Sequence, residues 1–456
     1  MRLTQHALSS SAPLRYVSFA ALYLAQGIPQ GFLLLTIPGW MAANGVDAGT
    51  VGGMVGLMVV PWTFKVLAGP LMDRYSYLPM GRRRPWLMGA QALLLLSTLG
   101  LALVPDPLHH LPLLGAMGFV VSCCGAVQDV ATDGLAVDII PEAEQARANG
   151  LMWGAKTAGM SGTLATGTWA IQHFGFATAV LGLSAALLLV MAVPSLLRER
   201  PGEKRFPWSS GTAASETLAL KAGTWGEILF TLRKGFLLRT SLLGASCLVL
   251  YGFLTGLKDT QLPLFTIGQL GWANEAYANT VAAANLGSAL VAMVVAGWLA
   301  DRVGKVRIIS FYLLLMAALW ATLAFAPGRW GDTGFITAMV YAQQAVETFC
   351  TVALFATAMH LCWQRVAATQ FTLYMVCNNV GYAAAGAALG GLRGALDWTG
   401  MFMLCGSLPL TAGILVLYLR LHRHTDALAE LEQAHLQRLA ELNIQPELGV
   451  PGSLVE

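Results

Sequence analysis

Apolar runs of about 20 residues recur along the whole chain, and they limit what it can fold into. A run of that length crosses the core of a bilayer as an α-helix, because a helix satisfies its own backbone polar groups. Of the 456 residues, 56% are hydrophobic and only 11% are charged, and the mean hydropathy is +0.61. A typical soluble domain is about 25% charged. The sequence therefore predicts an all-α membrane protein.

About twelve transmembrane helices are expected. They fall at residues 15–38, 49–72, 84–105, 111–139, 148–171, 176–197, 237–266, 277–301, 307–326, 334–361, 369–393 and 400–421. A polar segment with several charges separates the sixth from the seventh. We therefore expect an N-terminal six-helix bundle over 1–197, a cytoplasmic linker over 198–236, a C-terminal six-helix bundle over 237–421 and a cytoplasmic tail over 422–456.

Basic residues lie almost entirely in one set of loops, and the opposite loops hold only Arg329 and Arg393. The positive-inside rule places the basic loops, both termini and the linker in the cytoplasm. A polar N-terminal segment leads directly into a full-length apolar run, so we expect the first helix to be retained. The sequence after Thr425 predicts a short amphipathic cytoplasmic helix, either a solubilising tail or a partner site.

A motif of glycine, aspartate and basic residues occurs at the same place in both halves, as expected for a duplicated transporter unit. It comprises Gly69, Asp73, Arg74, Gly81, Arg82 and Arg83 after the second helix, and Asp301, Arg302, Gly304 and Lys305 after the eighth. Glycine permits close helix approach, and an aspartate can accept from a helix N-terminus or pair with arginine. The motif predicts a latch, with its basic run kept in the cytosol by the cost of burial.

Charged residues also fall inside the predicted spans. Asp129 and Asp133 lie one helical turn apart on the same face of the fourth span. Lys65 in the second span and Lys156 in the fifth lie at similar depth. Such charges must be paired or face a polar cavity. We expect Asp133 to pair with the lysines and Asp129 to be available for transport; structural salt bridges at the cytoplasmic gate are the alternative.

Further polar residues mark a candidate pathway for substrate or protons. These are Gln26, Gln30, Gln128, Lys258, Asp259, Gln343, Gln344 and Glu347. Glu347 has no basic neighbour in its own span, so it is a candidate proton carrier, although a neutral hydrogen-bonded glutamate is an alternative. Lys258 and Asp259 could bind an anionic group or pair with each other. Asp138, close to Pro141, is expected to cap the end of the fourth span.

Several motifs occur in the order found in a known family: Gly27-Ile28-Pro29, Phe64-Lys65, Pro70–Tyr75, Gly81–Arg84, Gln128-Asp129 with Asp133, and Ala368–Phe371. Together they resemble the peptide–acetyl-CoA transporter branch of the major facilitator superfamily, which includes AmpG-like muropeptide permeases. The resemblance implies the two-bundle facilitator fold, in which the first, fourth, seventh and tenth spans line a central cavity. It also implies proton-driven import of muropeptides across a bacterial inner membrane.

Siderophore permeases of the same branch are also similar. The chain departs from the muropeptide permeases in two ways. Some of those proteins carry an extra pair of spans, and they tend to have Glu-Asn where this chain has Gln343-Gln344.

We therefore expect a secondary active transporter that works by alternating access on a small polar or anionic molecule. A proton on Glu347 or Asp129 would be the coupling ion, and Lys258 or Lys156 would bind an anionic part of the cargo. The partners expected are this small molecule, protons and the lipid bilayer, without nucleic acid, cofactor or metal, and the protein is expected to be a monomer. No nucleophile–base pair or phosphate-binding loop is apparent, so an enzyme is not expected. A non-transporting membrane sensor is the alternative of another class.

Overall fold

The computed structural model describes residues 7–220 and 224–441, and most of them are helical. Every predicted transmembrane range is occupied by a helix, so the all-α prediction is confirmed. The first half contains α1 (Ala12–Gly31), α2 (Ile37–Ala43), α3 (Ala48–Phe64), α4 (Ala68–Arg74), α5 (Arg84–Leu101), α6 (Leu111–Ile139), α7 (Gln145–Phe174) and α8 (Phe176–Ser195). The second half contains α11 (Arg239–Pro263), α12 (Asn274–Val303), α13 (Lys305–Phe325), α14 (Thr333–His360), α15 (Ala367–Ala395) and α16 (Trp398–Leu417).

Further helices lie between and after the two halves. These are α9 (Ser215–Ala219), α10 (Trp225–Phe236) and α17 (Leu421–Glu441). The first residues of the N-terminal segment, part of the linker (221–223) and the end of the tail (442–456) lie outside the described residues.

Hydropathy alone singles out only some of these helices. Within the described residues, seven helical segments are long and apolar enough to cross a membrane, some of them made of two successive helices, while α14 and α15 meet that test as a pair that is bent by 107°. The helix α7 does not stand out, because it carries polar residues such as Asn149 and Lys156 that are buried inside the molecule.

The first span of each half is interrupted at the same place. Pro29 lies near the end of α1 and is followed by a π-helical turn over Phe32–Thr36. Pro263 ends α11 and is followed by a π-helical turn over Leu264–Gln269. Proline lacks the amide proton that the helix needs and clashes with the preceding turn, so the local hydrogen bonding is rearranged. This matched irregularity supports the duplication inferred from the repeated motif.

Glycine lets the first and fifth spans of each half pack closely. A Cβ atom on Gly27 of α1 would overlap the backbone carbonyl of Lys156 on α7. A Cβ atom on Gly252 of α11 would likewise overlap the carbonyl of Asn378 on α15. Backbone approach of this kind is common between membrane helices, where close packing replaces the hydrophobic effect as the main source of association.

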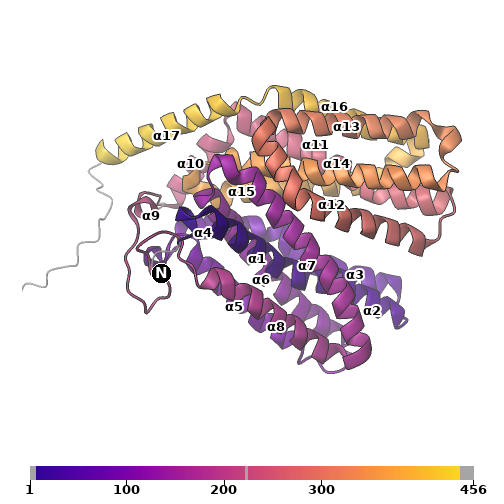
Figure 1. Ribbon diagram of the computed structural model, residues 1–456, viewed down its shortest axis with the longest axis horizontal. Helices are drawn as coiled ribbons and strands as arrows, with labels where there is room; N and C mark the ends of the chain where they lie inside the picture. The colour runs from indigo at the N-terminus through magenta and orange to yellow at the C-terminus, as the bar shows by residue number, and fades with distance from the viewer. Residues whose placement is uncertain (1–6, 221–223, 442–456) are drawn as a thin grey trace, which may run out of the picture.

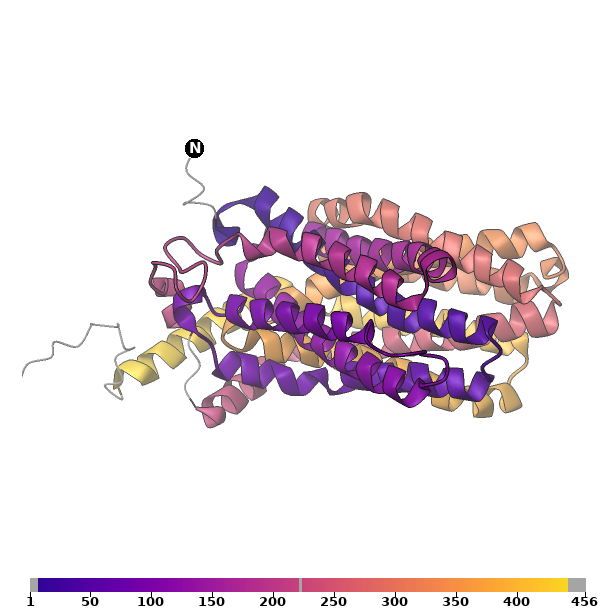
Figure 2. The same ribbon diagram turned by 90° about the horizontal axis from the view of Figure 1, so that it is seen from below.

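The two bundles meet at one end of the molecule, which carries the loops with Arg82, Arg147 and Arg365 and is called the basic end below. Helices α7 and α12 pack together, and a Cβ atom on Gly297 would overlap the carbonyl of Ala146. The start of α15 packs against α4. Figure 1 shows α9, α10 and α17 gathered at this end, and the bundles diverging away from it. Figure 2 shows the same elongated arrangement from below.

Candidate functional site

A buried ion pair lies inside the first bundle. The Nζ atom of Lys65 is 2.6 Å from Oδ2 of Asp129, and each side chain is 3% exposed. The other oxygen of Asp129 accepts a 2.5 Å hydrogen bond from Nε2 of Gln26 on α1. Asp133 instead accepts a 2.5 Å hydrogen bond from the hydroxyl of Tyr23. The expectation that Asp133 pairs with Lys65 and leaves Asp129 available is therefore wrong.

Asp129 rather than Asp133 pairs with Lys65 for a geometric reason. Helical spacing puts Asp129 and Asp133 on one face of α6, but it does not say which of them reaches the second span. The second span is interrupted at Lys65 by a 3₁₀ turn over Lys65–Leu67, and the lysine lies at the level of Asp129.

Lys156 is held by aromatic rings. Its Nζ atom lies 5.0 Å from the ring centre of Trp62, 5.2 Å from that of Trp153 and 6.0 Å from that of Tyr23. A desolvated cation over aromatic faces gains about 2 kcal/mol. Lys156 therefore adds positive charge to the cluster from a cage rather than from a direct ion pair with either aspartate.

A second ion cluster lies in the other bundle. Lys258 on α11 places Nζ 2.5 Å from Oε2 of Glu347 on α14 and 3.2 Å from Oδ1 of Asp259. It also donates a 3.1 Å hydrogen bond to Oε1 of Gln344. Asp259 accepts a 3.1 Å hydrogen bond from Tyr382 and is 43% exposed at its side chain. Glu347 is therefore not isolated. Its own span supplies no base, but Lys258 on the neighbouring helix α11 pairs with it.

Two other predicted pathway residues take different positions. Gln128 is fully buried, and its amide donates at 3.3 Å to the carbonyl of Leu22 on α1 and to Thr132. This contact ties α6 to α1 and does not place Gln128 in a cavity. Gln343 is buried too, and in the described part of the chain neither of its amide atoms has a hydrogen-bond partner.

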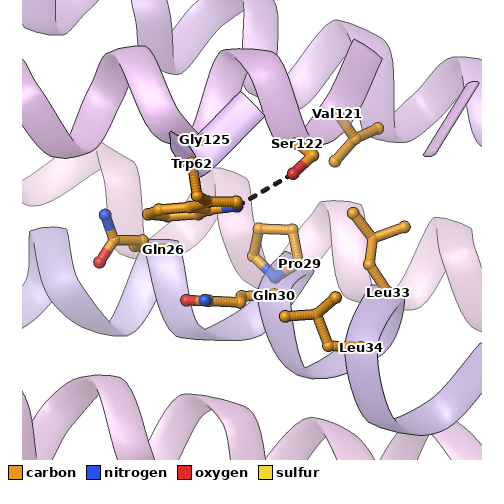
Figure 3. Close-up of a pocket in the computed structure, with 9 residues that line it drawn as sticks. All are labelled: Gln26, Pro29, Gln30, Leu33, Leu34, Trp62, Val121, Ser122 and Gly125. Carbon is orange, nitrogen blue, oxygen red and sulfur yellow. Dashed lines mark hydrogen bonds between the residues drawn. The ribbon is translucent and has the colours of Figure 1, made fainter. Parts of the chain in front are cut away.

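A small pocket opens beside the first ion cluster (Figure 3). Its lining consists of Gln26, Pro29, Gln30, Leu33, Leu34, Trp62, Val121, Ser122 and Gly125. The indole Nε1 of Trp62 donates a 3.0 Å hydrogen bond to Oγ of Ser122. The pocket has a volume of about 10 Å³. That is enough for roughly one water-sized group.

The first copy of the repeated motif joins the two bundles. One oxygen of Asp73 accepts hydrogen bonds from the backbone amide of Thr369 at 3.0 Å and from its hydroxyl at 2.5 Å. Thr369 lies in the first turn of α15, in the other half of the chain. Asp73 also pairs with Arg82 and Arg83. Both contacts expected of this aspartate, with a helix N-terminus and with arginine, are present.

The arginines of this motif are buried inside the protein, although the expectation gave the cost of burial as the reason why the basic run stays in the cytosol. The side of the membrane on which this loop lies stays a prediction. Arg82, Arg83 and Arg84 are each at most 1% exposed. Arg82 donates to the backbone carbonyls of Gln364 and Arg365 in the other half. Burial is tolerated because carboxylates and carbonyls accept from the guanidinium groups.

Other members of the motif occupy the same loop. Asp138 does not cap its helix as expected; it pairs instead with Arg83 at 2.9 Å and with Arg82 at 3.3 Å. Arg74 lies over the ring of Tyr75 at 5.3 Å. Gly81 has a φ of +103°, a conformation that residues with a Cβ atom rarely adopt.

The second copy of the motif also reaches across to the first half. Oδ2 of Asp301 accepts from Nε of Arg147 at 3.2 Å and from the Arg147 backbone amide at 3.3 Å. Lys305 donates to Oε1 of Gln145 at 2.7 Å. Gly304 has a φ of +99°, and Arg302 lies over the ring of Trp298 at 5.2 Å. The two aspartates therefore hold opposite sides of the same junction.

Two glutamates of the linker complete the junction, and sequence reasoning did not identify them. The carboxylate of Glu199 accepts from the backbone amides of Arg82, Arg83 and Arg84 at 3.1, 2.9 and 3.1 Å. Glu203 accepts a 2.5 Å hydrogen bond from Thr217. Burial, with the charge of Glu199 close by, raises the pKa of Glu203 to about 7. These two glutamates lie in a linker with many charged residues. No motif or spacing in the sequence distinguishes them from the neighbouring charged residues that are exposed to solvent.

Comparison with known proteins agrees with this architecture. Residues 19–386 match the sequence profile of the Major Facilitator Superfamily. The anhydromuropeptide permease of Escherichia coli K12 is 26% identical over 411 residues, covering 88% of this chain and 78% of that protein. An uncharacterised protein of Haemophilus influenzae is 30% identical over 118 residues, covering 26% of this chain and 27% of that protein.

Solved structures share the fold. The facilitator transporter FucP, in its outward conformation, has a TM-score of 0.68 with 13% identity and covers 90% of this chain and 99% of its own. A bacterial homologue of the iron transporter ferroportin, in an outward-facing state, has a TM-score of 0.64 with 11% identity, covering 89% and 98%. The profile match extends over most of the chain, so this protein belongs to the Major Facilitator Superfamily and is a multi-pass membrane transporter.

Proposed function

We propose that this protein is a proton-coupled importer that carries an anhydromuropeptide, or a similar polar anionic molecule, across a bacterial inner membrane. The E. coli relative supports the cargo and the membrane, because its similarity extends over most of both chains. The ion pair between Lys258 and Glu347 carries the proposal of coupling. It joins α11 to α14, and it can be broken by a proton on the carboxylate or by an anionic cargo at the lysine.

Alternating access follows from the contacts between the bundles. Asp73 with Thr369 and Asp301 with Arg147 hold the two halves together at the basic end. The positive-inside rule places this end, and with it both termini, in the cytoplasm. The arrangement therefore corresponds to a state closed toward the cytoplasm. Transport requires these latches to open while the bundles close at their other end.

The proposed cycle uses the Lys258 cluster as a switch. A proton delivered from outside neutralises Glu347 and weakens its attraction for Lys258. Lys258 keeps Asp259 as a partner, and a carboxylate of the cargo then takes the place of Glu347 beside the ammonium group. The cluster thereby regains the net charge that it had before protonation, so proton and cargo move together.

Proteoliposomes with an imposed proton gradient test this scheme. Glu347→Gln should abolish gradient-driven accumulation of a radiolabelled anhydromuropeptide and leave cargo exchange intact, because the amide mimics a permanently protonated carboxyl. Glu430→Gln, at an exposed position on α17, is the matched control and should transport normally. Normal accumulation by the Glu347 variant would refute the role as proton carrier.

Two alternatives give different results in the same system. A siderophore permease would accumulate a ferric siderophore in preference to the anhydromuropeptide. A sensor would bind its ligand without flux in either direction. The E. coli relative favours the muropeptide, and the buried charges in both bundles favour transport over sensing.

A further inference from the structure

The amphipathic helix α17, which follows the last membrane helix, docks on the basic end of the molecule (Figure 1). Leu428 and Leu431 on its apolar face pack against a small buried cluster. That cluster consists of Ile228 on α10 with Trp363 and Val366 in the turn at 361–366, which connects α14 to α15. The apolar face of α17 is therefore covered by this chain itself.

An ion pair joins α17 to the same turn. The carboxylate of Glu432 accepts from Nε of Arg365 at 2.8 Å and from Nη2 of Arg365 at 2.5 Å. It also accepts a 2.8 Å hydrogen bond from the indole Nε1 of Trp363. A bidentate pair between a guanidinium and a carboxylate fixes the orientation of both groups. Nη1 of Arg365 in turn donates to the carbonyl of Ala219 on α9 at 3.0 Å, so the turn is bonded to both the tail and the linker.

The start of α17 holds the other end of the turn. Nε2 of His424 lies 3.0 Å from the carbonyl oxygen of Leu361, and the hydroxyl of Thr425 lies 3.3 Å from Nε2 of His360. His424 and Glu432 are eight residues apart, which places them on one face of a helix. One rigid helix therefore bonds to both ends of the turn.

This turn supplies partners to the first copy of the repeated motif. The backbone carbonyls of Gln364 and Arg365 accept from Arg82 of the first half. Thr369, which follows the turn, donates its amide and its hydroxyl to Asp73. The position of the turn thus decides whether Arg82 and Asp73 both meet their partners when the bundles close at the basic end.

We propose that α17 is a brace for the cytoplasmic gate, with Glu432 acting through Arg365 as a positioning residue. An acceptor that is already held in place loses less conformational entropy when its donor arrives, so the contact is more stable. By holding the turn at 361–366, the brace raises the fraction of molecules that are closed toward the cytoplasm. The inference rests on the alternating access proposed above and does not depend on the cargo.

Hydrogen exchange of the purified full chain in detergent micelles tests the brace, because it measures how often a hydrogen bond opens. Two backbone amides report on the junction: Thr369 bonds to Asp73, and Arg147 bonds to Asp301. Each is the third residue of its helix, where an amide has no acceptor within the helix itself. Mass spectrometry of overlapping peptides isolates both amides.

Glu432→Gln should speed the exchange of both amides about tenfold, the effect of weakening one charge-assisted contact. Glu430→Gln, at an exposed position of the same helix, is the matched control and should change neither rate. The amide of Arg147 is the decisive reporter, because among the described residues neither Arg147 nor Asp301 has a hydrogen bond or ion pair with α17. Faster exchange at Thr369 alone, or at neither amide, would refute the brace.

Asp73→Asn separates failure of the brace from failure of the gate. If this variant leaves the exchange of the Arg147 amide unchanged, the two sides of the junction do not open together, and the proposed gate fails with its brace. If Asp73→Asn speeds that exchange and Glu432→Gln does not, the brace alone is overturned. A chain that ends at Thr425 keeps the contacts of His424 and Thr425 but lacks Glu432; it should match Glu432→Gln, and it decides the question should that variant fail to fold.

Discussion

Breaking the ion pair between Lys65 and Asp129 should destabilise the first bundle strongly. Its charged atoms are 2.6 Å apart, and both side chains are 3% exposed. Removing one partner of such a pair leaves an uncompensated buried charge and costs about 3–5 kcal/mol. We therefore expect a loss of that size in the free energy of unfolding for Lys65→Met and for Asp129→Asn.

The double variant distinguishes a pair from two independent sites. Once Lys65 is replaced, Asp129→Asn removes a charge that no longer has its partner, so the double variant should lose less than the sum of the two single losses. We expect an interaction energy of at least about 2 kcal/mol, within the range measured for residues of one network. Equilibrium unfolding in mixed detergent micelles, followed by circular dichroism, measures each corner of the cycle.

Asp133 provides the matched comparison, because its short hydrogen bond goes to Tyr23 and not to the lysine. A cycle that combines Lys65→Met with Asp133→Asn should give a smaller interaction energy than the cycle with Asp129. The reasoning would be refuted if the Lys65 and Asp129 losses simply added, or if the larger interaction energy belonged to Asp133.

Three further predictions concern the junction and the helix packing. Asp73→Asn weakens the charge-assisted contact with Thr369, worth about 1.5–3 kcal/mol. It should increase the labelling of Cys362, a buried cysteine that follows α14 at the basic end, by a cytoplasmic reagent; unchanged labelling would contradict the latch. Glu203 has a folded-state pKa of about 7 against an ordinary 4.5, so its own contribution to stability is fully present below about pH 4.5. That contribution falls by up to about 3 kcal/mol as the pH rises to 7. Glu203→Gln should flatten that part of the profile of unfolding free energy against pH, and a profile with the original slope would exclude this glutamate as its source. Gly252→Val should prevent folding because its Cβ overlaps the backbone of α15, whereas Gly287→Val, where the Cβ meets open space, should give monodisperse protein by gel filtration.

The helices and their duplication could be predicted because both depend on local properties of the chain. The apolar runs have the length that a helix needs to cross a bilayer, so they predict the transmembrane helices. The motif around Asp73 recurs around Asp301 at the same place in the other half, so it predicts the duplication. The contact of Asp73 with a helix N-terminus was also predictable, because the motif specifies both the charge and its position at the end of a span.

The partners of the buried charges were not predictable in the same way. Sequence spacing gave the depth of Lys65, Asp129 and Asp133 but not the rotation of their helices. A rotation of one residue, about 100°, decides which aspartate meets the lysine. The pairing of Lys258 with Glu347 was not predicted for a related reason. The two residues lie on different helices, α11 and α14, 89 positions apart in the chain, and sequence spacing does not show which helix faces meet.

By itself, the sequence determined a duplicated bundle of membrane helices with its charges at particular depths and its basic loops on one side. Those properties follow from the free energy of transferring each segment into a bilayer, which depends on composition and not on neighbours. Only the tertiary structure decided which charges pair, that the arginines at 82–84 are buried, and that Glu199 holds their loop. Such contacts depend on helix rotation and close packing between distant segments, where a buried ion is tolerated only if its partner arrives from another helix.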